Sequence, residues 1–339
     1  MGPREMNRRR FLGTAGVAAG AVVAGGAIAT ALEGGEAGAD TGSDIVPFYG
    51  VTQAGITTPT QSRLHIAAFD VVDGAARADV QDLMRRWTAA AARLSEGRTL
   101  GEGEPTALAP PPDTGEAVGL PAAKLTVTIG FGPTFFERGG RDRFGIAAQR
   151  PAALRQIEAL PGDELDPAKS GGDLCVQACA DVPEVAFHAV RNLARIGRGI
   201  VVMRWSQLGF GRTAITSSAQ ETPRNLMGFK DGTNNITADE RDALAKFVWV
   251  GAEAPAWMRG GTYMVTRRIR MLIEVWDRAS LGDQEATIGR VKSTGAPLGR
   301  GAEHDKVDLE ARSAAGPVVP LDAHVRLAAP VSNDGVRIL

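Results

Sequence analysis

The sequence predicts an α+β protein in which two split βαβ units follow one another along the chain. Two observations indicate this class. Strand-like and helix-like hydrophobic patterns alternate between residues 64 and 205, and a strand-then-helix pattern begins again at Tyr263. With 339 residues and 44% hydrophobic residues, the chain is long enough for two domains with their own cores. A formal net charge of −1 gives no general basic field, so nucleic acid is not an expected partner.

In the first unit, the strands are expected at residues 64–72, 124–131, 173–179 and 200–205. Between the first two strands, Ala75 to Glu96 has apolar residues at the i, i+3, i+4, i+7 spacing of an amphipathic helix. A second helix is expected after Asp181, which we predict to cap it, because Pro183 and Glu184 suit a first turn. The order β-α-β-β-α-β is the arrangement called ferredoxin-like.

The second unit is predicted to begin with a long strand from Tyr263 to Trp276, followed by a short helix from Ser280 to Arg290. The remaining strands and the second helix of this unit have no counterpart in the sequence. A half-built sheet would leave an apolar face and an edge uncovered. We therefore expect two ferredoxin-like domains, at residues 45–215 and 216–339, with the second one incomplete and the chain truncated at its C-terminus.

The N-terminal residues 1–44 are predicted to form a signal peptide and a linker. Basic residues near position 8 precede an uncharged run from Phe11 to Leu32, as in export signals. The alternative is a membrane anchor, but repeated glycines make the run weakly hydrophobic and favour export. Arg8 and Arg9, followed by Phe11, resemble a twin-arginine (Tat) signal, which a receptor reads as an address. The expected location is therefore periplasmic, at the cell envelope or extracellular, and the Tat export machinery is an expected partner.

Cys175 and Cys179 are the only cysteines, and they lie on the strand expected at 173–179. Residues four apart on a strand are separated by roughly 13 Å. A disulfide requires Cα atoms within about 7 Å, so we expect two small buried thiols without a bond between them. No zinc-binding spacing is present.

A polar, glycine-containing turn, Asn225–Asn235, holds the carboxylate Asp231 directly before Gly232. Asp-Gly alone is an ordinary signal for a surface turn. However, apolar residues precede it, so the turn is expected to lie against a core. A carboxylate that is partly desolvated there would have a raised pKa and could exchange protons near neutral pH. Both readings remain open from the residues alone.

His324 lies in an apolar context, between Leu321 and Leu327. A single histidine with such neighbours is more often a core or surface residue than a metal ligand. The same holds for His65, His188 and His304. The run Glu303-His304-Asp305 contains residue types that bind metals, but adjacent side chains point in different directions, so we do not expect a metal site there.

Several motifs in a fixed order resemble the exported branch of the dye-decolourising haem peroxidases, which includes the Tat-dependent deferrochelatase/peroxidases of iron uptake. The resemblance covers roughly residues 45–339. The motifs are Asn225–Asn235, Phe247–Val250, Ala256–Trp257 with Gly260–Tyr263, Glu274–Arg278, Thr294–Gly299 and Asp322–Leu327. It implies two ferredoxin-like units, with haem bound in the second.

The resemblance implies one haem b per chain, with His324 as the proximal ligand to its iron. It implies that Asp231 is the distal acid/base, and that the haem is lined by Gly232, Thr233, Asn234, Ala329 and Pro330. The expected substrates are hydrogen peroxide with a small organic reductant, or haem itself if the protein releases its iron. Alternatives are a haem-binding protein of iron acquisition without significant peroxidase turnover, and a nonenzymatic ferredoxin-like module. Iron-uptake components and a second copy in a homodimer are further expected partners.

The family pattern also includes a distal arginine shortly after the proximal histidine. This sequence ends at Leu339, before that position, and Arg337 precedes it. We therefore expect the polypeptide to lack the distal arginine, whose cationic group would stabilise charge as the O–O bond breaks.

Overall fold

The computed structural model describes residues 44–101, 107–160, 162–211 and 221–329. The signal segment, Pro330 and Arg337 therefore lie outside the described residues. The first half contains β1 (Arg63–Val71), α1 (Arg77–Ser95), β2 (Thr126–Phe131), α2 (Pro133–Phe136), η1 (Ala147–Gln149), η2 (Pro167–Lys169), β3 (Leu174–Ala180), α3 (Pro183–Ile196) and β4 (Val201–Phe210). The second half contains α4 (Arg241–Phe247), η3 (Ala256–Met258), α5 (Ile273–Trp276), α6 (Leu281–Ile288), β5 (Arg312–Ser313), β6 (Gly316–Pro317) and α7 (His324–Leu327).

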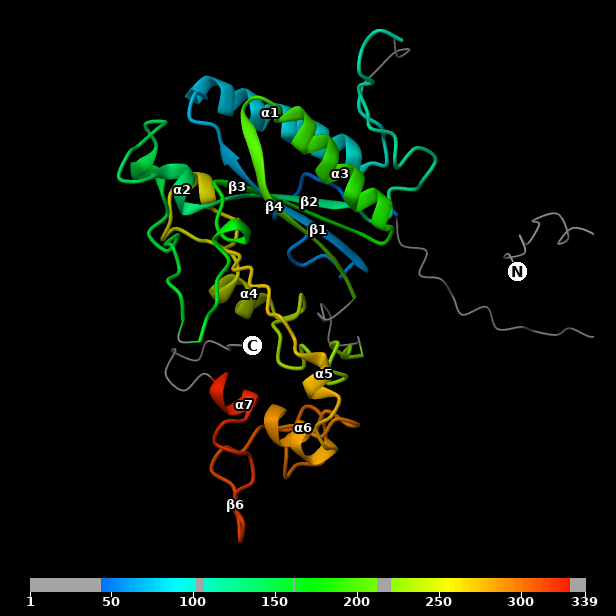
Figure 1. The fold of residues 1–339 in the computed structure, drawn as a ribbon, viewed down its shortest axis with the longest axis vertical. Helices are drawn as coiled ribbons and strands as arrows, with labels where there is room; N and C mark the ends of the chain where they lie inside the picture. Colours follow the sequence, from blue (N-terminus) through cyan, green and yellow to red (C-terminus); the bar gives the residue numbers. More distant parts are fainter. Residues whose placement is uncertain (1–43, 102–106, 161, 212–220, 330–339) are drawn as a thin grey trace, which may run out of the picture. The chain divides into compact units, whose positions relative to one another are not determined.

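The first four strands form one antiparallel sheet with the order β2-β3-β1-β4 (Figure 1). In its register, Arg63 faces Ala180 on one side and Phe210 on the other. Helices α1 and α3 follow β1 and β3, so the chain order is β-α-β-β-α-β. The predicted ferredoxin-like topology of the first unit and the α+β class are therefore confirmed.

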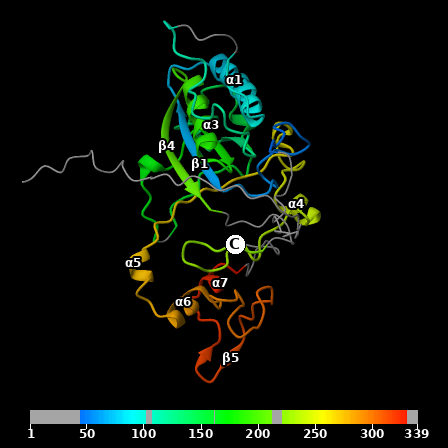
Figure 2. The same ribbon diagram turned by 90° about the vertical axis from the view of Figure 1, so that its right-hand side faces the viewer.

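Helices α1 and α3 lie on the same face of this sheet (Figure 2), and the main core fills the space between them and the strands. Trp87 of α1 is fully buried, and its ring packs against Phe69 of β1 at a centroid distance of 5.4 Å. The indole nitrogen donates to the Leu193 carbonyl of α3 at 2.8 Å. Burial of each large apolar side chain contributes about 1.5–3 kcal/mol. This core positions both helices on the sheet.

Asp181 does not cap α3, as we predicted it would. The N-cap is Val182, and no side chain makes the capping hydrogen bond. Asp181 Oδ1 instead accepts a hydrogen bond from the Ser62 backbone N–H at 3.0 Å. The reason is tertiary: Arg63 pairs with Ala180 across the sheet, which brings the N–H of Ser62 beside Asp181.

The two cysteines lie on β3 as free thiols, so the absence of a disulfide between them is confirmed. Both are half-buried. Burial raises the pKa of Cys175, and it raises the pKa of Cys179 to about 11. At neutral pH these thiols are therefore protonated and poor nucleophiles.

The predicted strand from Tyr263 to Trp276 is wrong in this structure. Residues 261–272 have no regular secondary structure, and residues 273–276 form the short helix α5. A strand needs neighbours that satisfy its backbone groups. Within residues 221–329, the described sheet structure is limited to the two-residue strands β5 and β6 and isolated bridges, so no partner strand is present. Apolar residues of the segment remain exposed, among them Ile269 at 74%.

The short helix predicted at residues 280–290 is confirmed as α6. Ser280 is its N-cap, and the side-chain oxygen accepts the Asp283 N–H at 3.1 Å. Gly289 ends the helix in the left-handed conformation, with φ of 90°. None of the helices in the described ranges is both long and apolar enough to cross a membrane.

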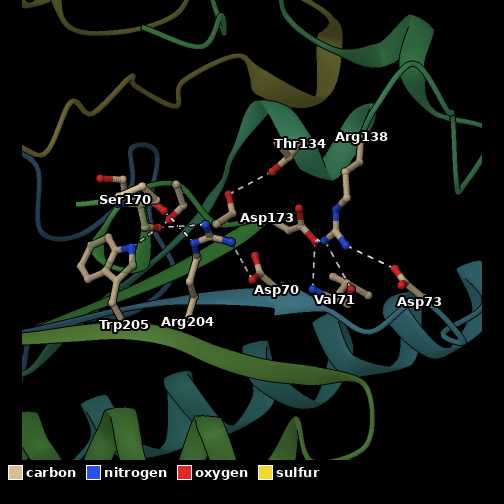
Figure 3. Close-up of polar contacts among 12 residues, drawn as sticks. Asp70, Val71, Asp73, Thr134, Arg138, Ser170, Asp173, Arg204 and Trp205 are labelled. Atoms are coloured by element: carbon tan, nitrogen blue, oxygen red, sulfur yellow. Dashed lines mark hydrogen bonds and ion pairs between the residues drawn. The ribbon is translucent and has the colours of Figure 1, made fainter. Parts of the chain in front are cut away.

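A buried ion cluster fixes the end of the first sheet (Figure 3). Asp173 is almost fully buried, and its Oδ2 atom accepts the Val71 N–H at 2.9 Å and pairs with Arg138. The Arg143 guanidinium lies 3.6 Å from the same oxygen. A buried carboxylate is stable only when paired and hydrogen-bonded in this way. The cluster ties the chain before β3 to the end of β1 and to residues 138–143.

Candidate functional site

The Asp231 turn is ordered by hydrogen bonds of Asn225. Its Oδ1 atom accepts the N–H groups of Met227 and Phe229 at 3.0 and 3.2 Å. Its Nδ2 atom donates to Asp231 Oδ2 at 3.2 Å. The Asp231 N–H donates to the Pro223 carbonyl at 2.9 Å, which fixes the backbone below the carboxylate. One amide side chain therefore organises the turn and contacts the candidate acid/base.

Phe229 anchors the turn on an apolar base. It is 2% exposed and packs against Trp276, with ring centroids 6.0 Å apart. The ammonium group of Lys292 lies 5.4 Å from the centre of the Phe229 ring. The prediction that the turn lies against a core is confirmed for Phe229. Asp231 itself is exposed, so the predicted desolvation of its carboxylate is wrong in this structure, because Phe229 and not Asp231 occupies the buried position of the turn.

The residues after Asp231 follow the same turn. Gly232 has φ of +90°, a conformation that favours glycine, and the Asn235 N–H donates to its carbonyl at 3.0 Å. Thr233 is half-buried, and its hydroxyl donates to Glu303 Oε1 at 3.1 Å. Asn234 is exposed. The turn therefore presents Asp231 and Asn234 to solvent, while Thr233 is turned toward the rest of the second half.

His324 is the first residue of α7, and its side chain is exposed. The helix is fixed by Arg326, whose guanidinium donates to the carbonyls of Pro320, Leu309 and Val319 at 3.1, 2.7 and 2.9 Å. Leu321 and Leu327 beside it are 67% and 73% exposed. The imidazole thus stands on a fixed backbone, next to uncovered apolar side chains.

Helix α6 connects the two candidate residues through packing. Lys292, below the Asp231 turn, donates from Nζ to Gln284 of α6 at 2.6 Å. Directly after the last residue of α6, a Cβ on Gly289 would lie only 2.3 Å from Val325 of α7. Among the described residues, no hydrogen bond or ion pair joins Asp231 directly to His324. The Asp231 turn and the helix that carries His324 therefore both pack around α6, and these two candidate side chains, both among the described residues, do not contact each other through a hydrogen bond or ion pair.

Of the two remaining residues predicted to line the haem, Ala329 lies within the described residues and Pro330 does not. Ala329 is half-buried and follows α7, with its N–H donating to the Arg326 carbonyl at 3.2 Å. Pro330 lies outside the described residues. In the described part of the chain, Glu303, His304 and Asp305 do not converge as a group of metal ligands: Glu303 binds Lys230, and Asp305 accepts the N–H groups of residues 301 and 302.

Two polar residues were missed by sequence reasoning. Glu303 binds both Lys230 and Thr233 beside Asp231. Asp113, in an irregular loop, binds the buried His188 of α3 at 2.7 Å. Hydrogen bonds to Asp113 from the N–H groups of Leu100 and Gly115 lower its pKa despite the opposing effect of burial. No sequence spacing signals these pairs, because the partners are 70 or more residues apart.

The family model for the N-terminal domain of Dyp-type peroxidases matches residues 53–211, and the model for their C-terminal domain matches residues 222–339. A deferrochelatase of Shigella flexneri serotype 5b is 39% identical over 333 residues, covering 97% of this chain and 77% of the relative. A deferrochelatase of Escherichia coli K12 is 38% identical over 335 residues, covering 97% of this chain and 78% of the relative.

Solved structures agree with this relationship. A DyP-type peroxidase from Streptomyces coelicolor superposes with a TM-score of 0.76 at 42% identity, covering 87% of this chain and 76% of that chain. Ferric DtpA from Streptomyces lividans gives a TM-score of 0.75 at 42% identity, with 87% and 76% coverage. This chain therefore belongs to the DyP-type peroxidases, enzymes that use haem b to reduce hydrogen peroxide.

Proposed function

We propose that this chain is an exported haem peroxidase in which His324 ligates the haem iron and Asp231 transfers the protons of hydrogen peroxide, with small organic molecules as reductants. The observation that carries the proposal is the match of the two family models, whose second part includes both Asp231 and His324. The exposed carboxylate on an ordered turn supports it.

The residues of the second half fit haem in their chemistry. An imidazole is a common axial ligand of haem iron. His324 has an exposed ring on a fixed helix, and the exposed Leu321 and Leu327 beside it offer apolar contacts for a flat macrocycle. Gly232, Thr233, Asn234, Ala329 and Pro330 are the proposed lining residues. Bound in this way, haem b would supply the iron at which peroxide is reduced.

Asp231 performs the proton transfer in this proposal. Its Oδ2 atom accepts a hydrogen bond from Asn225, which orients the carboxylate and leaves Oδ1 available for peroxide. The carboxylate takes the proton from one peroxide oxygen and returns it to the departing oxygen, which leaves as water. The reductant then supplies two electrons, and with two protons from the reductant or solvent these convert the remaining peroxide oxygen to a second water. No net proton remains on Asp231 after the cycle.

Substitution Asp231→Asn tests the assignment. Amide in place of carboxylate keeps the size of the side chain but cannot accept the proton. We expect haem to be retained, while the second-order rate constant for reaction with peroxide, followed by stopped-flow absorbance, falls at least a hundredfold, in the range typical of general acid–base catalysis, roughly 10²–10⁴-fold. A matched control is Asp277→Asn in the same half. An unchanged rate in Asp231→Asn would assign the proton transfer to another group.

A second candidate function is release of iron from haem, because the relatives at 38–39% identity are named deferrochelatases. Product analysis after incubation with haem separates the two activities. Intact protoporphyrin with free iron supports deferrochelatase activity, and unchanged haem with peroxide turnover supports peroxidase activity. Bound haem with neither reaction would support a role in haem binding for iron acquisition, with iron-uptake components as partners.

Export by the Tat pathway is also part of the proposal. It is supported by Arg8 and Arg9 ahead of the uncharged run from Phe11 to Leu32. The protein would then act in the periplasm, at the cell envelope or outside the cell, and a homodimer is the proposed assembly. Replacing Arg8 and Arg9 with lysine should retain the full-length precursor in the cytoplasm. Export of this variant at the normal level would contradict a twin-arginine signal.

A further inference from the structure

The residues on the two sides of Asp231-Gly232 bind the same distant carboxylate. Lys230 Nζ lies 2.6 Å from Glu303 Oε2, and the Thr233 hydroxyl donates to Glu303 Oε1 at 3.1 Å. Each oxygen of Glu303 therefore holds one flank of the segment that carries Asp231. Thr222, just ahead of the turn, is a further hydrogen-bond donor to this carboxylate.

This contact is shielded from solvent. The side chains of Lys230 and Glu303 are only 14% and 12% exposed, whereas Glu221, 3.9 Å from the same Lys230, is 89% exposed. Burial raises the pKa of Glu303, but the hydrogen bonds from Lys230, Thr222 and Thr233 outweigh it, so the pKa lies below its usual value. Ion pairs on the open surface contribute about 0–1 kcal/mol. The shielded pair with its extra hydrogen bonds is a stronger connection.

Glu303 is itself held in place through its backbone. Arg290 Nη1 donates to the Glu303 carbonyl at 3.0 Å and to the Gly295 carbonyl at 2.7 Å. Gly295 has φ of +78°, and a Cβ there would lie 2.8 Å from Lys230 and 3.3 Å from Glu303. The absence of a side chain at Gly295 allows this close approach. The carboxylate therefore sits on an ordered support, formed by residues 290–303.

We propose that Glu303 is a positioning residue for Asp231. It acts by fixing Lys230 and Thr233, and so sets the direction in which the Asp231 carboxylate points. The inference rests on the proposed function, in which Asp231 transfers protons. Proton transfer requires donor and acceptor to be within about 2.6–3.2 Å of each other, and a displacement of 1 Å can cost about a hundredfold in rate.

The test uses the full-length holoenzyme with Glu303→Gln, Glu303→Ala and the matched control Glu310→Gln. Gln keeps an acceptor for Thr233 and removes the charge that binds Lys230, while Ala removes both. Glu310 is exposed and lies outside the site. Three quantities are measured: the rate constant with peroxide across pH, the haem content, and amide hydrogen exchange of residues 229–234 with and without haem.

We expect Glu303→Gln to retain haem, to slow the peroxide reaction by roughly tenfold to a hundredfold, and to speed exchange at residues 229–234. Glu303→Ala should be slower still, and Glu310→Gln should match the parent. In an Asp231→Asn background, Glu303→Gln should cause no further loss, since its effect passes through Asp231. An equal loss in both backgrounds would overturn the proposal, because a merely structural role would lower both rates.

The outcomes separate the two ideas. If Asp231→Asn slows the reaction but Glu303→Gln changes neither the rate nor the exchange, the positioning role is wrong and the acid/base role stands. If Asp231→Asn leaves the rate unchanged, the acid/base role is wrong. Amide hydrogen exchange of residues 229–234 in the haem-free protein then still decides whether Glu303 fixes the turn, because this measurement does not depend on activity.

Discussion

Lys230 Nζ lies 2.6 Å from Glu303 Oε2, so the residue directly before Asp231 is bound to a carboxylate 73 positions further along the chain. This pair closes the long loop that contains α4, α5 and α6. It also fixes one side of the candidate acid/base without any contact to the Asp231 side chain itself. The geometry of the site is therefore determined by a distant residue as well as by the turn motif.

Replacing His324 with Ala should abolish haem retention, because the proposed iron ligand is lost while Arg326 still holds the helix. Haem content would be measured from the Soret absorbance and the pyridine haemochrome of the purified protein. His304→Ala is the control, since this imidazole is also exposed, at 69%. Normal haem content in His324→Ala would overturn its assignment as ligand.

Replacing Gly289 with Ala should loosen the contact between α6 and α7. The added Cβ would lie 2.3 Å from Val325, in a residue with φ of +90°. Gly115→Ala is the control, because it has φ of +87° but open space around it. Both variants carry the left-handed backbone penalty of about 1–2 kcal/mol, and overpacking should add about 1–3 kcal/mol to Gly289→Ala alone. Chemical denaturation measures the free energy of unfolding of both variants. An equal loss of stability in the two would mean that α7 moves freely to accommodate the methyl group.

His65 should make the first domain less stable at acid pH. The imidazole is 5% exposed, stacks on Phe187 and has no partner for Nδ1 among the described residues. Burial lowers its pKa below 6.5 in the folded state. Below that pH the unfolded chain binds a proton that the folded chain resists, so stability falls as the pH decreases.

In His65→Leu this loss of stability at acid pH is absent, because the leucine side chain does not bind a proton. The stability of the variant relative to the parent should therefore increase as the pH is lowered from about 8 to about 5, measured by urea denaturation at each pH. His304→Leu serves as an exposed control. A difference between His65→Leu and the parent that stays constant with pH would show that His65 does not resist protonation.

Replacing Asp173 with Asn should destabilise the first domain by about 3–5 kcal/mol, as expected for removing one partner of a buried ion pair. The change would leave Arg138 and Arg143 without their shared carboxylate. Asp70→Asn is the control (Figure 3), since its pair with Arg204 at 3.0 Å is more than one-third exposed on both sides. That variant should lose about 0–1 kcal/mol. Similar losses in the two variants would mean that burial adds little to the Asp173 cluster.

Much of the first domain could be predicted from the sequence because its elements have strong local periods. The helix expected at Ala75–Glu96 is observed as Arg77–Ser95, and the strand expected at 173–179 is observed as residues 174–180. The Asp181 cap failed for a non-local reason, since the sheet brings the N–H of Ser62 beside that carboxylate. Local patterns identify an element well, and predict the partners of its end residues poorly.

In the second half, the segment from Tyr263 to Trp276 has the alternation of a strand but not its structure. Alternation reports which side chains prefer burial, whereas strand formation also requires neighbouring backbone groups. The Asp231 turn shows the opposite case. The hydrogen bonds that order this turn join Asn225 to residues two to six positions further along. A turn could therefore be predicted at this place from the local sequence.

The sequence by itself determined the α+β class, the order of elements in the first domain and the positions of Asp231 and His324 as candidate residues. Periods of hydrophobicity and short motifs are properties of neighbouring residues, so they can be read along the chain. The tertiary structure alone decided that Asp231 is exposed, that Glu303 holds both of its flanks and that His188 pairs with Asp113. Burial and ion pairing depend on which distant segments meet, and that is determined only when the chain packs.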